Sequence, residues 1–157
     1  MNTVSRFPRP WVAGLDRSLL SGEALLSAIR GHHVGDHQLA QLACELGGLH
    51  HRRLLGRDSE CCRRRTELVS AVDVWMGAHL PIPHPDARVH TETLGAVIDR
   101  MAETQVRAYH LLMTVDPSDP QVHADWYRLA ELVDSYTDLV TGLSHRAIRL
   151  PALGDHR

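Results

Sequence analysis

The sequence contains no lysine, because all 17 of its basic residues are arginine. Lysine-anchored pyridoxal chemistry and Walker-type nucleotide hydrolysis both depend on a lysine side chain, so these enzyme classes are excluded. Aromatic residues are also scarce, at 4% with a single Phe. The hydrophobic core therefore has to be built mainly from Leu, Val, Ala, Met and Trp, which favours helices over a β-sandwich rich in aromatic residues.

Long apolar runs and a cysteine framework are absent as well. The first residues of the chain contain no apolar segment long enough for a signal peptide, and no later run approaches a membrane span. Three cysteines, two of them adjacent, do not predict a disulfide framework. We therefore expect a cytoplasmic protein without a membrane partner. A net charge of −2, counted with the 12 histidines neutral, does not favour a nucleic-acid partner either.

The length of 157 residues is that of one domain. Apolar residues recur at helical spacing in one short and four long segments. These segments are residues 18–29, a long run from residue 38, and residues 66–80, 91–110 and 120–145. We predict an all-α fold, a helical bundle of four main helices plus a short N-terminal helix. The bundle is expected to span residues 18–146, between an N-terminal arm (1–17) and a C-terminal tail (147–157).

The predicted helix over residues 91–110 carries two stripes at 100° per residue. One stripe is apolar and is expected to face the core; it consists of Leu94, Val97, Met101, Ala108 and Leu112. The opposite stripe is polar and consists of Glu92, Asp99, Glu103 and His110. The residues beside the polar stripe are small, among them Gly95, Ala96 and Ala102, and leave room for something to approach. This face is open to three interpretations: a site, a subunit contact or a solvated surface.

The long segment that begins at residue 38 changes character along its length. Its first half places leucines on one face. If the helix continues through Gly47, Gly48 and Gly56, the same face is then polar, with His50, Arg53, Arg57, Glu60, Cys61 and Arg64. Buried charge is costly unless it is paired. Either the helix leaves the core near one of the glycines, or the interior of the bundle becomes polar.

Residues 91–100, with the sequence TETLGAVIDR, are followed by Tyr109 and His110. This pattern resembles the most distinctive motif of a bacterial all-helical family, domain of unknown function 4254. The resemblance extends over about residues 20–150 and departs from the family at Arg53, Arg57 and Cys61, so the chain looks like a divergent member. It implies a helical fold and a set of positions, and it implies no activity.

The first functional hypothesis is a cofactor-independent acid–base enzyme, of lyase, isomerase or cyclase type, or a binder. It would act on a small anionic metabolite in a polar interior pocket. Arginine supplies a permanently charged fork for carboxylate or phosphate, and a carboxylate or histidine in a partly dry cavity can be tuned towards neutral pH. The predicted catalytic residues are Glu92, Asp99, His110 and Glu60, and the predicted substrate-binding residues are His50, Arg53, Arg57 and Arg100.

Other interpretations stay open at this stage. Asp99 and Arg100 would serve only the fold if they paired with neighbouring helices. A non-catalytic homodimer would use the small-residue face of helix 91–110. A looser metal site, the lesser alternative, would draw on Glu60, Glu92, Asp99, His110 and His123.

Overall fold

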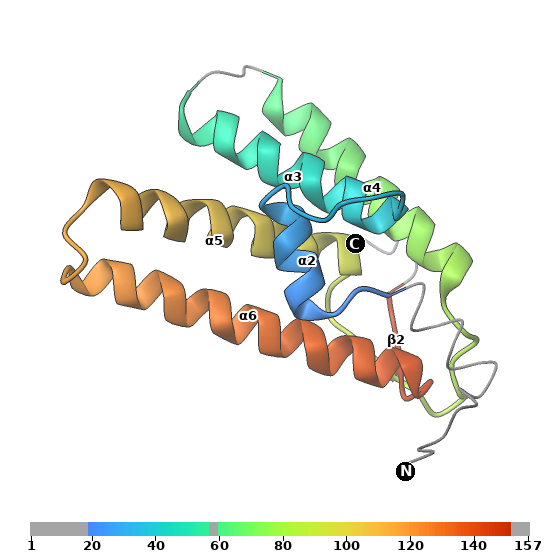
Figure 1. Cartoon of the computed structure of the whole chain (residues 1–157). Helices are drawn as coiled ribbons and strands as arrows, with labels where there is room; N and C mark the ends of the chain where they lie inside the picture. Colours follow the sequence, from blue (N-terminus) through green and yellow to red (C-terminus); the bar gives the residue numbers. More distant parts are fainter. Residues whose placement is uncertain (1–18, 57–59, 152–157) are drawn as a thin grey trace, which may run out of the picture.

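The computed structural model describes residues 19–56 and 60–151. These residues form five helices, α2 (Gly22–Ile29), α3 (Gln38–Leu54), α4 (Cys61–His79), α5 (Leu94–Thr114) and α6 (Pro120–Ser144), and two short strands, β1 (Arg88–Val89) and β2 (Ile148–Arg149). The long helices α3 and α5 run in one direction, and α4 and α6 run in the other (Figure 1). The short helix α2 packs across α3, α5 and α6. The predicted all-α bundle is confirmed. In the described part of the chain, no helix is both long and apolar enough to cross a bilayer.

Helices α2, α5 and α6 begin at side chains that cap their free N–H groups. Ser21 Oγ accepts from Ala24 N at 3.1 Å, and Thr93 Oγ1 accepts from Ala96 N at 3.2 Å. Asp119 Oδ1 accepts from Gln121 N at 2.9 Å and precedes a proline in the first turn, as the sequence predicts. These local signals fix where α2, α5 and α6 start.

The connection between α3 and α4 decides which arginines face the core. Helix α3 continues through Gly47 and Gly48 and ends at Leu54. Gly56 follows with φ +68°, a conformation that glycine adopts at low cost and that commonly ends a helix. Helix α4 then begins at Cys61, earlier than the predicted residue 66. Arg64 and Arg65 therefore belong to a helix that runs back alongside α3.

Helix α5 is central, because it contacts α2, α3, α4 and α6. Its apolar stripe is buried as predicted, except that Leu112 is 39% exposed. The opposite stripe is not a solvated surface in its middle, since Asp99 is only 6% exposed. The small residues Gly95 and Ala102 are buried too. They therefore pack inside the chain, whereas Ala96 of the same face is half-buried.

The segments before α5 and after α6 meet in a two-residue parallel ladder. Arg88 pairs with Ile148, and Val89 pairs with Arg149. Neither segment belongs to a predicted helix, so the ladder adds a contact that the helical pattern did not indicate. The predicted arm, residues 1–17, lies outside the described residues.

Candidate functional site

An ion-pair network joins the three helices α3, α4 and α5. His50 Nε2 lies 2.7 Å from Asp99 Oδ1. Arg65 donates to the other carboxylate oxygen of Asp99, from Nε at 2.8 Å and from Nη2 at 2.7 Å. An ionised carboxylate can only accept hydrogen bonds, so the Nε2 atom of His50 carries the proton. We call His50, Asp99 and Arg65 the three-helix clamp.

The clamp keeps Asp99 ionised. Burial alone would raise the pKa of the Asp99 carboxyl, but the hydrogen bonds from His50 and Arg65 lower it by more, so the pKa lies below its usual value. The hydrogen bond to Asp99 also raises the pKa of the Arg65 guanidinium. Arg65 and His50 therefore stabilise the ionised form of Asp99, and Asp99 stabilises the charged form of Arg65. The side chains of His50 and Asp99 are only 2% and 8% exposed, so the clamp is mostly shielded from solvent.

A small cavity of about 310 Å³ opens beside the clamp. His50, Arg53, Glu103 and Arg107 contribute its polar lining. Glu103 is already engaged, since Oε1 accepts from Arg107 Nη2 at 3.3 Å and Oε2 lies 3.6 Å from Arg65 Nη2. The cavity offers little of His50 to a ligand, because that residue is 3% exposed.

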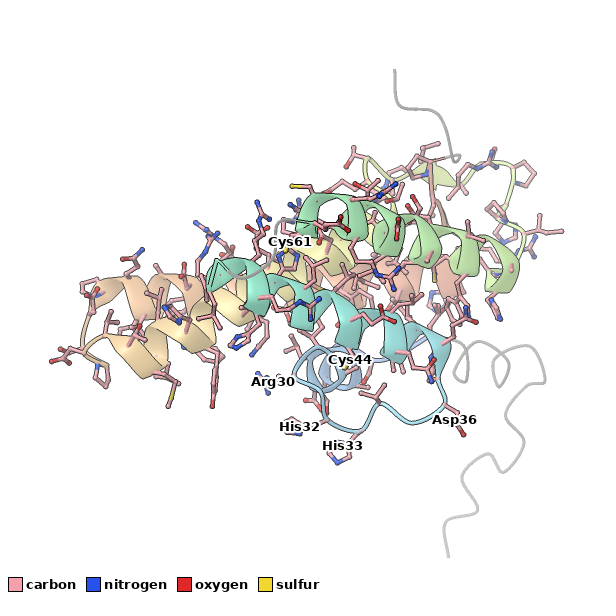
Figure 2. All side chains as sticks on the ribbon, turned by 90° about the horizontal axis from the view of Figure 1, so that it is seen from above. Arg30, His32, His33, Asp36, Cys44 and Cys61 are labelled. Atoms are coloured by element: carbon pink, nitrogen blue, oxygen red, sulfur yellow. The ribbon has the colours of Figure 1, made fainter. Side chains whose placement is uncertain are left out.

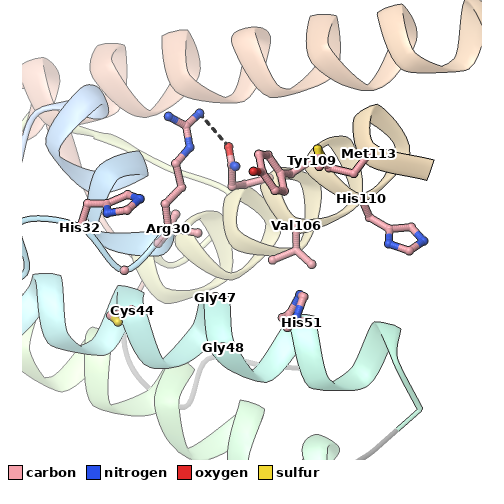
Figure 3. A pocket seen from close by; sticks show the side chains of 13 residues that line it. Arg30, His32, Cys44, Gly47, Gly48, His51, Val106, Tyr109, His110 and Met113 are labelled. Atoms are coloured by element: carbon pink, nitrogen blue, oxygen red, sulfur yellow. Dashed lines mark hydrogen bonds between the residues drawn. The ribbon is translucent and has the colours of Figure 1, made fainter. Parts of the chain in front are cut away.

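A larger cavity, about 570 Å³, lies between the end of α2, the middle of α3 and the second half of α5. This volume is within the range of sites for small organic ligands. Figure 3 shows Arg30 and His32 towards one end of it and His51 and His110 towards the other. Gln105 and Tyr109 add polar groups from α5. We call this space the α2–α3–α5 cavity.

The lining of the α2–α3–α5 cavity contains no acidic residue. Its 13 residues, all of them described, include one arginine, three histidines and one tyrosine, but no Asp or Glu. Arg30 forms no ion pair with any carboxylate of the described part of the chain. Its Nη2 donates to Gln105 Oε1 at 3.1 Å. Gln105 is buried, so it holds the guanidinium in place without neutralising it. The cavity therefore favours a negatively charged ligand.

Two adjacent glycines of α3 line the cavity and play different roles. A side chain on Gly47 would collide with the carbonyl of Ile29, so this glycine lets the end of α2 approach α3. A Cβ atom on Gly48 would meet only Arg52 Nη1, at 3.5 Å, which is an ordinary contact. The space above Gly48 thus belongs to the cavity.

The predicted site residues divide among several places. His50 and Asp99 meet in the clamp, Arg53 lines the small cavity and His110 lines the α2–α3–α5 cavity. The others lie elsewhere or are not described. Glu92 and Arg100 form a separate, more exposed pair at 2.8 Å, Glu60 is exposed just before α4, and Arg57 lies outside the described residues.

The polar face predicted from His50 to Arg64 does not exist as one face, because the chain turns after Gly56. Arg64 points away from the core and pairs with Glu45 at 2.6 Å and with Glu67 at 3.1 Å. Of the two alternatives stated for this polar segment, departure from the core is therefore correct for Arg64, whereas His50 stays in the buried interior. The sequence reasoning missed Arg65 in the clamp because it placed that residue on no particular face.

The reasoning also missed Arg30 and His51. Arg30 ends α2 and reaches Gln105, 75 positions along the chain, so no local pattern indicates the contact. His51 stands next to His50 but points to the other cavity. Figure 2 shows Arg30, His32 and His33 on the end of α2 and the following loop, and Cys61 apart from them near the start of α4. Cys44 and Cys61 form no disulfide bond with each other or with Cys62.

A metal site was the lesser alternative from the sequence. Among residues 19–56 and 60–151, no three or more His, Cys, Asp and Glu side chains converge as a metal site requires. Glu60, Glu92, Asp99, His110 and His123 do not form such a group. Asp99 has both of its oxygens engaged by His50 and Arg65.

Taken together, the fold and the site define a helical-bundle protein with a ligand-sized cavity that lacks acidic groups. The chain belongs to the DUF4254 family, proteins of unknown function, whose family model matches residues 59–151. No curated protein and no solved structure matches the chain. The matched residues include α4, α5 and α6, whereas Arg30 and His51 precede them.

Proposed function

We propose that the protein binds a small anionic metabolite in the α2–α3–α5 cavity and carries out a cofactor-independent acid–base step on it. The observation that carries this proposal is the lining itself, which combines an unneutralised Arg30 with three histidines and no carboxylate. Arg30 supplies the fixed charge for the anion. His51 and His110, towards the other end, supply the groups that take up and release a proton. A lyase, isomerase or cyclase reaction needs no more than these groups.

In this proposal Asp99 has a different role from the one predicted. It holds His50 and Arg65 and so joins α3 and α5, two walls of the cavity, to α4, and it does not touch the ligand. Its low exposure and its two occupied oxygens support this assignment. Glu92 and Glu60 are not part of the proposed site.

Binding is tested by thermal unfolding of the protein with a panel of carboxylates and phosphates. A ligand at a hundred times its dissociation constant adds about 2.7 kcal/mol to the free energy of unfolding, which raises Tm by roughly 5–10 °C for a chain of this size. The shift should disappear in Arg30→Gln. It should persist in the matched control Arg128→Gln, which removes an exposed arginine of α6 outside the cavity. An equal shift in Arg30→Gln, or no shift with any anion, contradicts the proposal.

Proton transfer is tested separately, on the ligand that the first screen finds. In D2O, an acid–base step exchanges ligand protons next to the reacting group or converts the ligand, and both changes are visible by NMR. We expect wild type to show exchange or conversion and His110→Gln to bind the ligand without it. A ligand that binds but stays unchanged with wild type leaves the protein a binder and removes the enzymatic part of the proposal.

A further inference from the structure

Among the residues that line the α2–α3–α5 cavity, one carries a permanent positive charge; Arg52 is not a lining residue, although its Nη1 lies 3.5 Å from the position of a Cβ on Gly48. Arg30 is the only arginine among the lining residues, and lysine does not occur in the sequence. No helix N-terminus points into the cavity either: its walls are the C-terminal end of α2 and interior turns of α3 and α5. Phosphate groups in proteins are commonly held at helix N-termini by free N–H groups. The lining therefore suits a single carboxylate on the guanidinium fork better than a phosphate.

The remainder of the cavity is larger and more apolar than a carboxylate alone requires. Ile29, Val106 and Met113 present aliphatic surface, and Tyr109 adds an aromatic ring. Gly48 leaves the face of α3 open at this point. Met113 is 67% exposed and Tyr109 is 54% exposed, so both have apolar surface that a ligand can cover. Covering this surface stabilises a complex in proportion to the apolar area removed from water.

We infer that the ligand of this cavity is a monocarboxylate attached to an apolar body about the size of one ring, with Arg30 binding the carboxylate and Tyr109, Val106 and Met113 contacting the body. This inference rests on the proposed function and narrows its substrate class. Gly48 determines specificity in this arrangement, because a side chain there would occupy the space of the apolar body.

The methionine methyl groups give a direct test. The sequence has four methionines; Met113 lines the cavity, whereas Met76 and Met101 are fully buried in the core. In protein labelled with 13C at the methionine methyls, benzoate and hexanoate should shift the Met113 signal and leave those of Met76 and Met101 in place. Acetate, inorganic phosphate and the uncharged benzamide should each bind at least about tenfold more weakly than benzoate. Benzamide loses the contact to a charged group, and acetate and phosphate lose the apolar contact.

Two variants test the two parts of the ligand. Arg30→Gln should weaken benzoate to the affinity of benzamide. Gly48→Leu should abolish the Met113 shift with benzoate, while the buried methionine signals show that the fold persists. The matched control Gly77→Leu also places a side chain on a helical glycine, but on α4, outside this cavity and with nothing within 4 Å of the added Cβ. It should bind benzoate as wild type does.

The outcomes separate this inference from the proposed function. If phosphate or acetate binds as tightly as benzoate and this binding is lost in Arg30→Gln, the proposed anion site is supported and the inferred apolar body is wrong. If benzamide matches benzoate, or Gly48→Leu binds benzoate normally, the inference is also wrong. If no anion of the panel perturbs Met113, the inference is wrong, and the proposed function is contradicted as well if none of these anions raises Tm.

Discussion

Replacing Asp99 with asparagine should destabilise the bundle and leave ligand binding in the α2–α3–α5 cavity intact. Removing one partner of a fully buried ion pair costs about 3–5 kcal/mol. Arg65, however, has a side chain that is 33% exposed, so part of its charge can be solvated and its share is closer to the roughly 1 kcal/mol of a surface pair. Asparagine also keeps one acceptor oxygen. We therefore expect the free energy of unfolding to fall by about 2–3 kcal/mol, mostly through loss of the shielded contact with His50.

The assay is urea unfolding monitored by circular dichroism, together with thermal unfolding. For a chain of this size the loss corresponds to a decrease in Tm of roughly 4–12 °C. The matched control is Glu92→Gln, which makes the same chemical change in the exposed pair with Arg100. It should stay within about 0.5 kcal/mol of wild type. In a double-mutant cycle, Asp99→Asn and Arg65→Gln should be non-additive, because they remove the same contact.

The reasoning is refuted if Asp99→Asn has wild-type stability but loses ligand binding or conversion. Asp99 would then act on the ligand, as the sequence alone led us to expect, and the three-helix clamp would not be its main role.

Two further predictions concern the same helices. Because the folded-state pKa of Asp99 is lowered, its contribution to stability is present above the unfolded-state pKa of about 3.9 and is lost as the pH falls through the lower folded-state pKa. In urea unfolding between pH 2 and pH 6, the free energy of unfolding should therefore fall less with acid in Asp99→Asn than in wild type. Equal pH profiles of the two proteins would contradict the role assigned to Asp99. Gly47→Ala should destabilise the protein, since its methyl group collides with Ile29, whereas Gly48→Ala should stabilise it by about 0.5–1 kcal/mol through helix propensity. Equal unfolding energies for these two variants would show that α2 does not approach α3 as described.

The helices could be predicted from the sequence because their signals are local. Apolar spacing gave all five helices, and the last predicted segment, residues 120–145, starts where α6 starts. The contact between His50 and Asp99 was also indicated in part, because both residues stood at polar positions of predicted helices and were assigned to one polar interior pocket.

Of the interpretations left open for the polar stripe of α5, a solvated surface is wrong at Asp99, because the helix is central. A helix with neighbours on several sides has no solvated face opposite its core face, so a polar position such as Asp99 ends up buried and paired. The assignment of Arg65 depended on where the chain reverses. Gly56 was one of three possible break points, and only the packed structure distinguishes it from Gly47 and Gly48.

The cavity could not be predicted, because tertiary contacts create it. The position of Arg30 depends on its contact with Gln105, and the close approach of α2 to α3 depends on Gly47. Such contacts between distant segments leave no periodic pattern in the sequence. Of the predicted catalytic residues, only His110 lines this cavity.

The central claim is that the α2–α3–α5 cavity binds an anion through Arg30. Its most direct test is the dissociation constant of benzoate, measured by titration calorimetry with wild type and with Arg30→Gln, with Arg128→Gln as the control. The account predicts that Arg30→Gln raises the constant by at least about tenfold and that Arg128→Gln leaves it unchanged. The same constant in Arg30→Gln as in wild type would contradict it.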